Sequence, residues 1–144
     1  MQHKKADDFV LATGETNTVR EFAELTFRNL GVELKWEGKG KSEKGKIKSI
    51  ELSKAKNLVG YSKNKKSYLA YQQAGVKDLT SKLKKDDTVI SIDPVYYRPT
   101  EVDLLIGDPS KAKKVLGWKA KTKFTKLVEL MIKSDMDKVL RRGY

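Results

Sequence analysis

The stretch from Asp93 to Trp118 constrains the fold of this chain more than any other part of the sequence. It begins with an Asp-Pro turn signal and places one arginine, Arg98, directly before a proline. The residue before a proline is disfavoured in the helical region and adopts extended geometry. Arg98 is therefore predicted to lie on a stiff, extended segment that aims its guanidinium group, with Glu101 three residues later.

The second half of this stretch predicts a buried segment followed by a short capped helix. Val102–Ile106 is a short run that is apolar except for Asp103. Asp108 before Pro109 is typical of an N-cap followed by a proline in the first helical position. Gly117 is placed where a glycine ends a helix.

Arg98 and Glu101 together suit a ligand that carries both phosphate and hydroxyl groups. A guanidinium group binds phosphate through two parallel hydrogen bonds, and a carboxylate accepts hydrogen bonds from a sugar hydroxyl. The alternative interpretation is a surface salt bridge at a turn, which the two residue types explain equally well by themselves.

The N-terminal third predicts strand, helix and strand in succession. Phe9–Ala12 is a short apolar run typical of a buried strand. Thr18 and Glu21 have the spacing of a capping box, and Gly31 can end the helix that they begin. Val32–Trp36 alternates apolar and charged residues, as in a strand with one buried face. Short links between these elements favour a βαβ unit and an α/β fold.

Two further elements are predicted in the C-terminal half. Val89–Ile92 is a strand candidate that leads into Asp93. Apolar residues at helical spacing from Phe124 to Leu140 predict a long last helix with one buried face.

The formal net charge of +12 over 144 residues is concentrated in one lysine-rich segment. Residues 39–85 hold fourteen lysines and three acids, so they carry +11 of that charge. We interpret about 39–87 as an insert, with weak helical spacing from Tyr68 to Leu83. A lysine run is most often a solvated face. The alternative is a basic binding module that uses Lys39–Lys85 on nucleic acid or an acidic partner.

Composition excludes several classes of site. The chain has no cysteine, and its single histidine, His3, cannot build a metal cluster or a histidine-centred triad. No run approaches the roughly 20 apolar residues of a membrane span. The first residues lack the apolar core of a signal peptide. We therefore predict a cytoplasmic protein with no metal site.

Two motif matches near the lysine-rich segment are interpreted as coincidence. Gly40–Lys46 resembles a phosphate-binding P-loop, but Ile47 stands where that motif requires Ser or Thr. Tyr61 and Lys65 have the spacing of the catalytic Tyr-x-x-x-Lys pair of short-chain dehydrogenases, but no dinucleotide-binding fold precedes them.

Several motifs resemble one enzyme family over most of the chain outside the insert. The family is that of the GDP-mannose 4,6-dehydratases, which belong to the extended short-chain dehydrogenases/reductases. The resemblance covers about Asp7–Gly38 and Val89–Met136, and its motifs are Thr13–Thr16, Val19–Phe22, Trp36–Gly38, Tyr96–Asp103, Gly107–Pro109 and Leu116–Lys119.

The resemblance implies a single C-terminal nucleotide-sugar-binding domain over residues 1–144. Its expected architecture is short strands with about three or four helices, without the Rossmann domain that binds NADP. The complete enzyme would be a lyase that converts GDP-mannose to GDP-4-dehydro-6-deoxy-mannose with the help of NADP.

In this resemblance Arg98 pairs with the diphosphate of GDP-mannose and Glu101 accepts a hydrogen bond from the ribose. The family's catalytic and NADP-binding residues belong to an N-terminal part that these 144 residues do not contain. We therefore expect the chain by itself to be inactive and to bind no cofactor. Its expected partners are the missing Rossmann half or further copies in a homo-oligomer, and nucleic acid is the less favoured partner.

Overall fold

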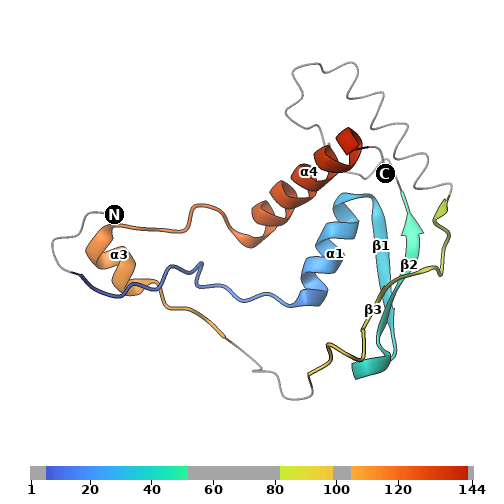
Figure 1. The fold of residues 1–144 in the computed structure, drawn as a ribbon, viewed down its shortest axis with the longest axis horizontal. Helices are drawn as coiled ribbons and strands as arrows, with labels where there is room; N and C mark the ends of the chain where they lie inside the picture. Colours follow the sequence, from blue (N-terminus) through green and yellow to red (C-terminus); the bar gives the residue numbers. More distant parts are fainter. Residues whose placement is uncertain (1–5, 52–81, 99–104, 143–144) are drawn as a thin grey trace.

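The computed structural model describes residues 6–51, 82–98 and 105–142 (Figure 1). These residues form a small α/β arrangement of three α-helices, one 3-10 turn and three strands. In chain order the elements are α1 (Val19–Asn29), β1 (Val32–Glu37), η1 (Gly40–Ser42), β2 (Lys44–Ile50), β3 (Thr88–Ser91), α3 (Ser110–Leu116) and α4 (Phe124–Arg142).

Helix α1 begins at the predicted capping box. The Thr18 hydroxyl accepts a 3.0 Å hydrogen bond from the Glu21 amide, and the Glu21 carboxylate accepts one of 2.6 Å from the Thr18 amide. These bonds satisfy amide groups that the first helical turn leaves unpaired. At the other end Gly31 adopts a φ of 78°, so the helix stops where the sequence predicts.

The three strands form an antiparallel sheet with β2 in the middle. Gly45 of β2 lies between Trp36 of β1 and Ile90 of β3. A side chain at this position would meet both neighbours, because a Cβ atom there would lie 3.2 Å from each. The absence of a side chain therefore leaves room for both Trp36 and Ile90 beside the central strand.

Two predictions about the sheet are wrong. Phe9–Ala12 forms no strand, and the large side chains of Val10 and Leu11 are 53% and 50% exposed. The expected βαβ unit is absent from the described residues. The reason is that Phe9–Ala12, the expected first strand, forms no strand, while β1 pairs antiparallel with β2 through a short connection. The predicted strands at 32–36 and 89–92 are confirmed as β1 and β3.

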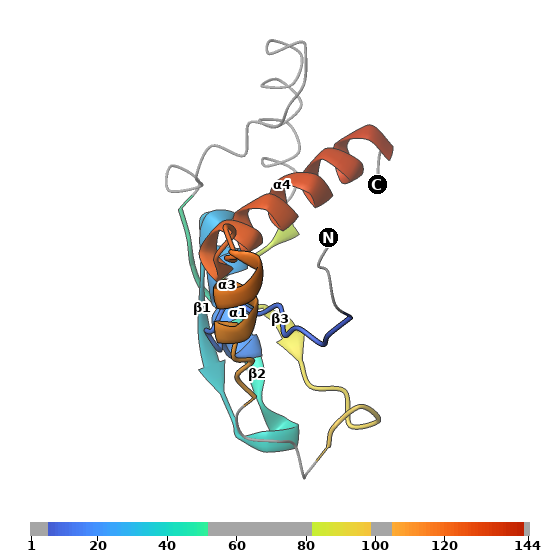
Figure 2. The same cartoon turned by 90° about the vertical axis from the view of Figure 1, so that its left-hand side faces the viewer.

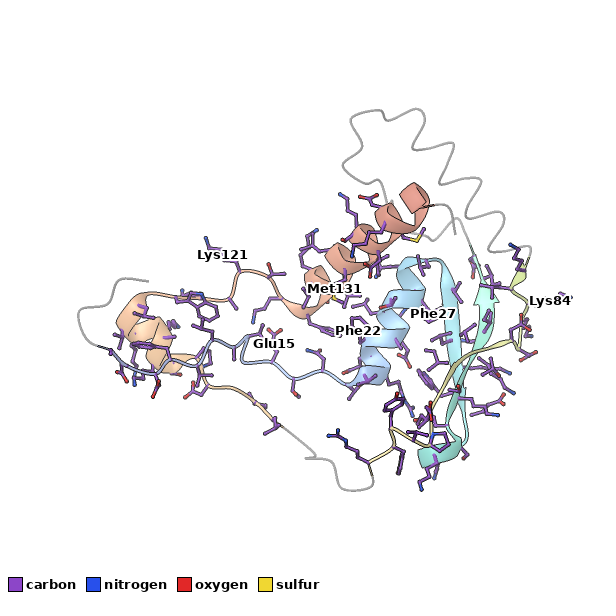
Figure 3. All side chains as sticks on the ribbon, viewed as in Figure 1. Glu15, Phe22, Phe27, Lys84, Lys121 and Met131 are labelled. Atoms are coloured by element: carbon purple, nitrogen blue, oxygen red, sulfur yellow. The ribbon has the colours of Figure 1, made fainter. Side chains whose placement is uncertain are left out.

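Helix α1 lies between the sheet and α4, and the core forms on both of its sides. In Figure 3, Phe27 lies on the side of α1 toward β1, and Phe22 lies on the side toward α4. The Phe22 ring is 6.4 Å from that of Phe124, centroid to centroid. The buried apolar side chains around α1 are Val32, Ile47, Val128 and Ile132.

The predicted helix after Asp108 is confirmed as α3, but its N-cap is Pro109 and not Asp108, so the predicted cap is one residue too early. The Asp108 carboxylate accepts a 2.9 Å hydrogen bond from the Ser110 amide, and hydrogen bonds from Ser110 lower the pKa of this carboxyl group. Gly117 adopts the left-handed conformation, with φ 64°, that ends the helix. Figure 2 shows that α4, the predicted last helix, extends beyond α1 at its C-terminal end.

Part of the lysine-rich segment is the central strand β2, which the sequence did not predict. Because a strand follows Gly40–Ser42, this turn lacks the helix that a P-loop requires. The weak helical spacing proposed between Tyr68 and Leu83 falls mainly on residues 52–81, outside the described residues, and so does the Tyr61–Lys65 match. In the described ranges, no helix is long and apolar enough to cross a membrane.

Candidate functional site

The predicted turn at Asp93 positions the segment that leads to Arg98. The Asp93 carboxylate accepts a 2.9 Å hydrogen bond from the Val95 amide, and its carbonyl oxygen accepts one of 3.1 Å from the Tyr96 amide. These bonds reverse the chain directly after β3. They lead the chain to Tyr97, which lies beside the turn that joins β1 to β2.

Tyr97 anchors this segment on η1. Its side chain is half-buried, and the ammonium group of Lys41 lies 5.4 Å from the centroid of its ring. A Cβ atom at Gly40 would lie 3.4 Å from the Tyr97 hydroxyl, so the ring rests against the backbone of η1. Arg98 follows this anchored residue and is exposed.

A third cation, Arg20 of α1, reaches the same end of the sheet. Its guanidinium group forms an ion pair with Glu43, the residue after η1, and lies 4.9 Å from the centroid of the Trp36 ring. The positive groups of Arg20 and Lys41 thus come from two parts of the chain to the region around η1, and Arg98 directly follows Tyr97, which contacts η1. Such a cluster favours anionic groups, and phosphate in particular.

The structure does not test whether Arg98 and Glu101 lie side by side, as the predicted ligand site requires. Glu101 lies outside the described residues, which stop at Arg98 on that side. The role of both residues in binding a ligand stays a prediction.

A hollow lies elsewhere, away from Tyr97 and Arg98. It has a volume of about 670 Å³ and is open to solvent. Its lining comes from the N-terminal segment and the link between α3 and α4, namely Leu11, Ala12, Thr13 and residues 117–122. Arg98 and Tyr97 are not part of this lining, so the hollow and the predicted ligand residues are separate features. Among the described residues, no three acidic or histidine side chains gather to hold a metal ion.

The described lysines of the basic segment include Lys46 and Lys48, which are paired with Glu37 and Glu33 of β1. Lys46 lies 2.6 Å from Glu37, while Lys35 of β1 lies 3.2 Å from Glu37 and 2.5 Å from Asp86. Hydrogen bonds from these lysines lower the pKa values of Glu37 and Asp86, and those that Lys35 donates to Asp86 and Glu37 raise its own pKa. This part of the sheet therefore presents mixed charge, which weakens the nucleic-acid interpretation.

Sequence reasoning missed strand β2 and the contacts between Tyr97 and η1. The alternation of lysine with Gly45 and Ile47 was a signal for a strand with one buried face. It was obscured because lysine dominates the composition of this segment. Arg20 lies in a motif that the sequence had identified, but its contact with Trp36 joins two elements and has no local signature.

Comparison with known proteins identifies the family. The sequence profile described as GDP-mannose 4,6 dehydratase matches residues 1–131. A GDP-mannose 4,6 dehydratase of Dictyostelium discoideum is 37% identical over 137 residues, which are 95% of this chain and 29% of that protein. The corresponding proteins of Vibrio cholerae serotype O1 and Homo sapiens are 36% and 34% identical over 137 residues.

This match confirms the resemblance seen in the motifs. It also shows that the resemblance covers only a part of each relative. The same 137 residues make up 30% of the Vibrio cholerae protein and 27% of the human protein. The chain thus spans less than a third of the length of these curated relatives. On the extent of the profile match, the chain belongs to the GDP-mannose 4,6-dehydratase family.

Proposed function

We propose that this chain is the C-terminal, substrate-binding portion of a GDP-mannose 4,6-dehydratase and supplies part of the pocket for the GDP-sugar. Arg98 would bind the diphosphate and Glu101 the ribose. The observation that carries the proposal is the anchored Tyr97, which fixes the backbone before Arg98 against η1. A fixed backbone lowers the entropy that the arginine loses when it binds.

The electrostatics around η1 support a diphosphate ligand. Lys41 adds positive charge beside Tyr97, the residue before Arg98, and Arg20 adds positive charge beside Trp36. Arg20 is already paired with Glu43, so its charge is partly neutralised. Arg98 is exposed at the end of the anchored segment, which leaves its guanidinium group accessible to a ligand.

The chemistry of the family would come from the part of the enzyme outside this chain. NADP, when bound there, would accept a hydride from the sugar and return it, so that GDP-mannose becomes GDP-4-dehydro-6-deoxy-mannose. In this proposal the chain binds and orients the nucleotide end of the substrate. We therefore expect no product when the purified chain is incubated with GDP-mannose and NADP, and turnover would contradict this division of roles.

Calorimetric titration with GDP tests the proposed contact. Arg98→Ala should weaken GDP binding by roughly 10- to 100-fold, because a charged hydrogen bond contributes about 1.5–3 kcal/mol. Arg98→Lys should recover only part of this loss, since lysine keeps the charge and lacks the bidentate geometry. Arg28→Ala, at an exposed position in the last turn of α1, is the matched control. Equal affinity of the Arg98→Ala and Arg28→Ala chains for GDP would refute the proposed role of Arg98.

A further inference from the structure

Glu43, the residue directly after η1, is largely withdrawn from water. Its side chain is 19% exposed, and its carboxylate forms an ion pair with the guanidinium group of Arg20 on α1. Within the described residues, Arg20 is the one cation paired with this carboxylate. A carboxylate that has lost much of its hydration needs a charged or hydrogen-bonding partner. This pair therefore matters more to the local structure than an ion pair between fully solvated groups.

Arg20 is itself held in one orientation. Its guanidinium group lies 4.9 Å from the centroid of the Trp36 ring on β1, which makes a cation–π contact. The Trp36 indole is fixed in turn by its 2.7 Å hydrogen bond to Glu24 of α1. Arg20 thus has the indole on one side and the Glu43 carboxylate at its end. An arginine restrained in this way can fix the position of Glu43 relative to α1.

The turn between β1 and β2 needs a support outside the sheet. The strand pairing ends at Glu37 and Lys44, so residues 38–43 lie beyond the last paired positions. Two glycines of this stretch have positive φ, at 85° and 55°, and glycine leaves the backbone free to adopt other conformations. The ion pair between Arg20 and Glu43 ties this turn to α1, whose N-terminal end lies toward the same end of the sheet (Figure 1).

Local hydrogen bonds close the turn, so that it moves as a unit. The Glu43 amide donates a 3.1 Å hydrogen bond to the carbonyl oxygen of Gly40. The amide and the hydroxyl of Ser42 donate hydrogen bonds of 3.2 and 2.9 Å to the carbonyl oxygen of Lys39. A displacement of Glu43 would therefore displace Gly40 and Lys41 as well.

Gly40 and Lys41 are the residues that support Tyr97. A Cβ atom at Gly40 would lie 3.4 Å from the Tyr97 hydroxyl, and the Lys41 ammonium group lies 5.4 Å from the centroid of the ring. Arg98 follows Tyr97 directly in the chain. A series of direct contacts thus leads from Arg20 through η1 to the backbone that carries Arg98.

We propose that Arg20 is a positioning residue for the nucleotide site. Its ion pair with Glu43 holds η1 in the place where η1 supports Tyr97, and this support restrains Arg98 before the GDP-sugar binds. The inference rests on the proposed function and adds to it a residue that acts without touching the ligand. Restraint before binding reduces the entropy that the site loses when the ligand arrives.

Titration with GDP measures the effect on binding. Arg20→Ala should weaken GDP binding by roughly 3- to 10-fold, which corresponds to the cost of ordering a side chain and a short loop. Arg20→Lys should keep part of the affinity, since lysine can still pair with Glu43. Arg28→Ala, which removes an exposed arginine from the same helix, is the matched control and should bind GDP as the wild-type chain does.

The Arg20→Ala variant should keep helix α1. Alanine is the best helix former, and a cation is unfavourable in the first turn of a helix. The circular dichroism spectrum should therefore be unchanged, and the loss of GDP affinity can be assigned to the turn.

Glu43→Ala distinguishes positioning from direct contact with phosphate. This variant frees the Arg20 guanidinium group and raises the net charge by one. An arginine that binds phosphate directly would then bind GDP more tightly, whereas a positioning arginine loses its hold on η1, so that the affinity falls. Combining Arg20→Glu with Glu43→Arg rebuilds the ion pair with opposite polarity and should restore part of the affinity. Tighter binding by Glu43→Ala would overturn the proposal.

Backbone NMR gives a measurement that needs no ligand. The {1H}–15N NOE values of the Tyr97 and Arg98 amides report motion on the picosecond-to-nanosecond timescale. They should fall in the Arg20→Ala chain and recover in the double variant, while the values in α4 stay unchanged. Unchanged values at Tyr97 and Arg98 in the Arg20→Ala chain would show that Arg20 does not restrain this segment.

The same samples distinguish a failure of this inference from a failure of the proposed function. If Arg98→Ala loses GDP affinity and Arg20→Ala keeps it, the nucleotide site stands and the positioning role is wrong. If Arg98→Ala binds GDP as tightly as the wild-type chain, the proposed function is wrong, and the positioning role for a nucleotide site is wrong with it.

Discussion

The indole Nε1 of Trp36 donates a 2.7 Å hydrogen bond to Oε1 of Glu24 and thereby joins β1 to α1. Both side chains are half-buried. One helical turn before Glu24, the guanidinium group of Arg20 covers the same indole ring. Trp36 is thus held by two side chains of α1. These contacts fix the end of β1 from which the chain enters η1 and the region of Arg98.

Replacing Trp36 by Phe should destabilise the chain by about 1–3 kcal/mol, because the half-buried Glu24 carboxylate loses its donor. Urea denaturation monitored by circular dichroism measures the change in the free energy of unfolding. Glu24→Gln is the control, since its amide oxygen can still accept the hydrogen bond and the loss should be smaller. If Trp36→Phe is no more harmful than Glu24→Gln, this hydrogen bond does not stabilise the fold.

Gly45→Ala should destabilise the sheet by about 1–3 kcal/mol, which is typical of overpacking. The added Cβ atom would lie 3.2 Å from both Trp36 and Ile90, so neighbouring strands must move apart. Thermal unfolding gives the measurement. Lys44→Ala, at the exposed neighbouring position in β2, should change the melting temperature little. A Gly45→Ala chain as stable as Lys44→Ala would show that the sheet absorbs the extra methyl group.

The capping box should make stability depend on acid pH through Glu21. The hydrogen bond from the Thr18 amide lowers the pKa of Glu21 below its ordinary value of 4.5 in the folded chain. A carboxyl group with a lowered folded pKa stabilises the fold above its unfolded pKa, and the effect is lost as the pH falls through the folded pKa. The melting temperature of the wild-type chain should therefore fall as the pH drops below about 4.5.

Glu21→Gln should show a smaller fall over the same pH range, because its amide oxygen accepts the hydrogen bond without titrating. Asp8→Asn, at an exposed position outside any helix or strand, is the control and should follow the wild-type curve. Parallel curves for the wild-type and Glu21→Gln chains would mean that Glu21 contributes nothing to the acid sensitivity.

Gly107→Ala should loosen the contact between residues 7–13 and the segment around Gly107 without unfolding the rest of the chain. The new methyl group would lie 2.7 Å from the Cβ atom of Ala12, a distance that forces the two extended segments apart. Hydrogen exchange should then become faster in residues 7–13 and stay unchanged in α1 and β1, since local opening needs less free energy than global unfolding. Unchanged exchange in residues 7–13 would contradict the close packing of the two segments.

The sequence predicted those elements whose signals are local. The Thr18–Glu21 capping box, the φ of 78° at Gly31 and the left-handed Gly117 all act within a few residues. The helices that they begin or end are therefore found where the sequence places them. The turn at Asp93 is equally local, because its hydrogen bonds reach only two and three residues along the chain.

The sequence failed where pairing between distant residues decides the structure. Lysines dominate β2, and its place in the centre of the sheet depends on β1 and β3 closing around Gly45. The same difference between local and distant contacts applies to the candidate site. Arg98 could be selected from its proline and its motif, whereas its support by Tyr97 on Gly40 and Lys41 joins residues more than fifty positions apart.

Sequence by itself determined the positions of the helices, the outer strands and the family, because capping, alternation and short motifs are properties of neighbouring residues. Only the tertiary structure decided that the sheet is antiparallel and that Trp36 is held between Arg20 and Glu24. It also decided that Phe9–Ala12 lies against Gly107 with its large side chains half-exposed. The physical reason is that burial depends on which distant surfaces meet, and an apolar run encodes the need for cover without specifying what provides it.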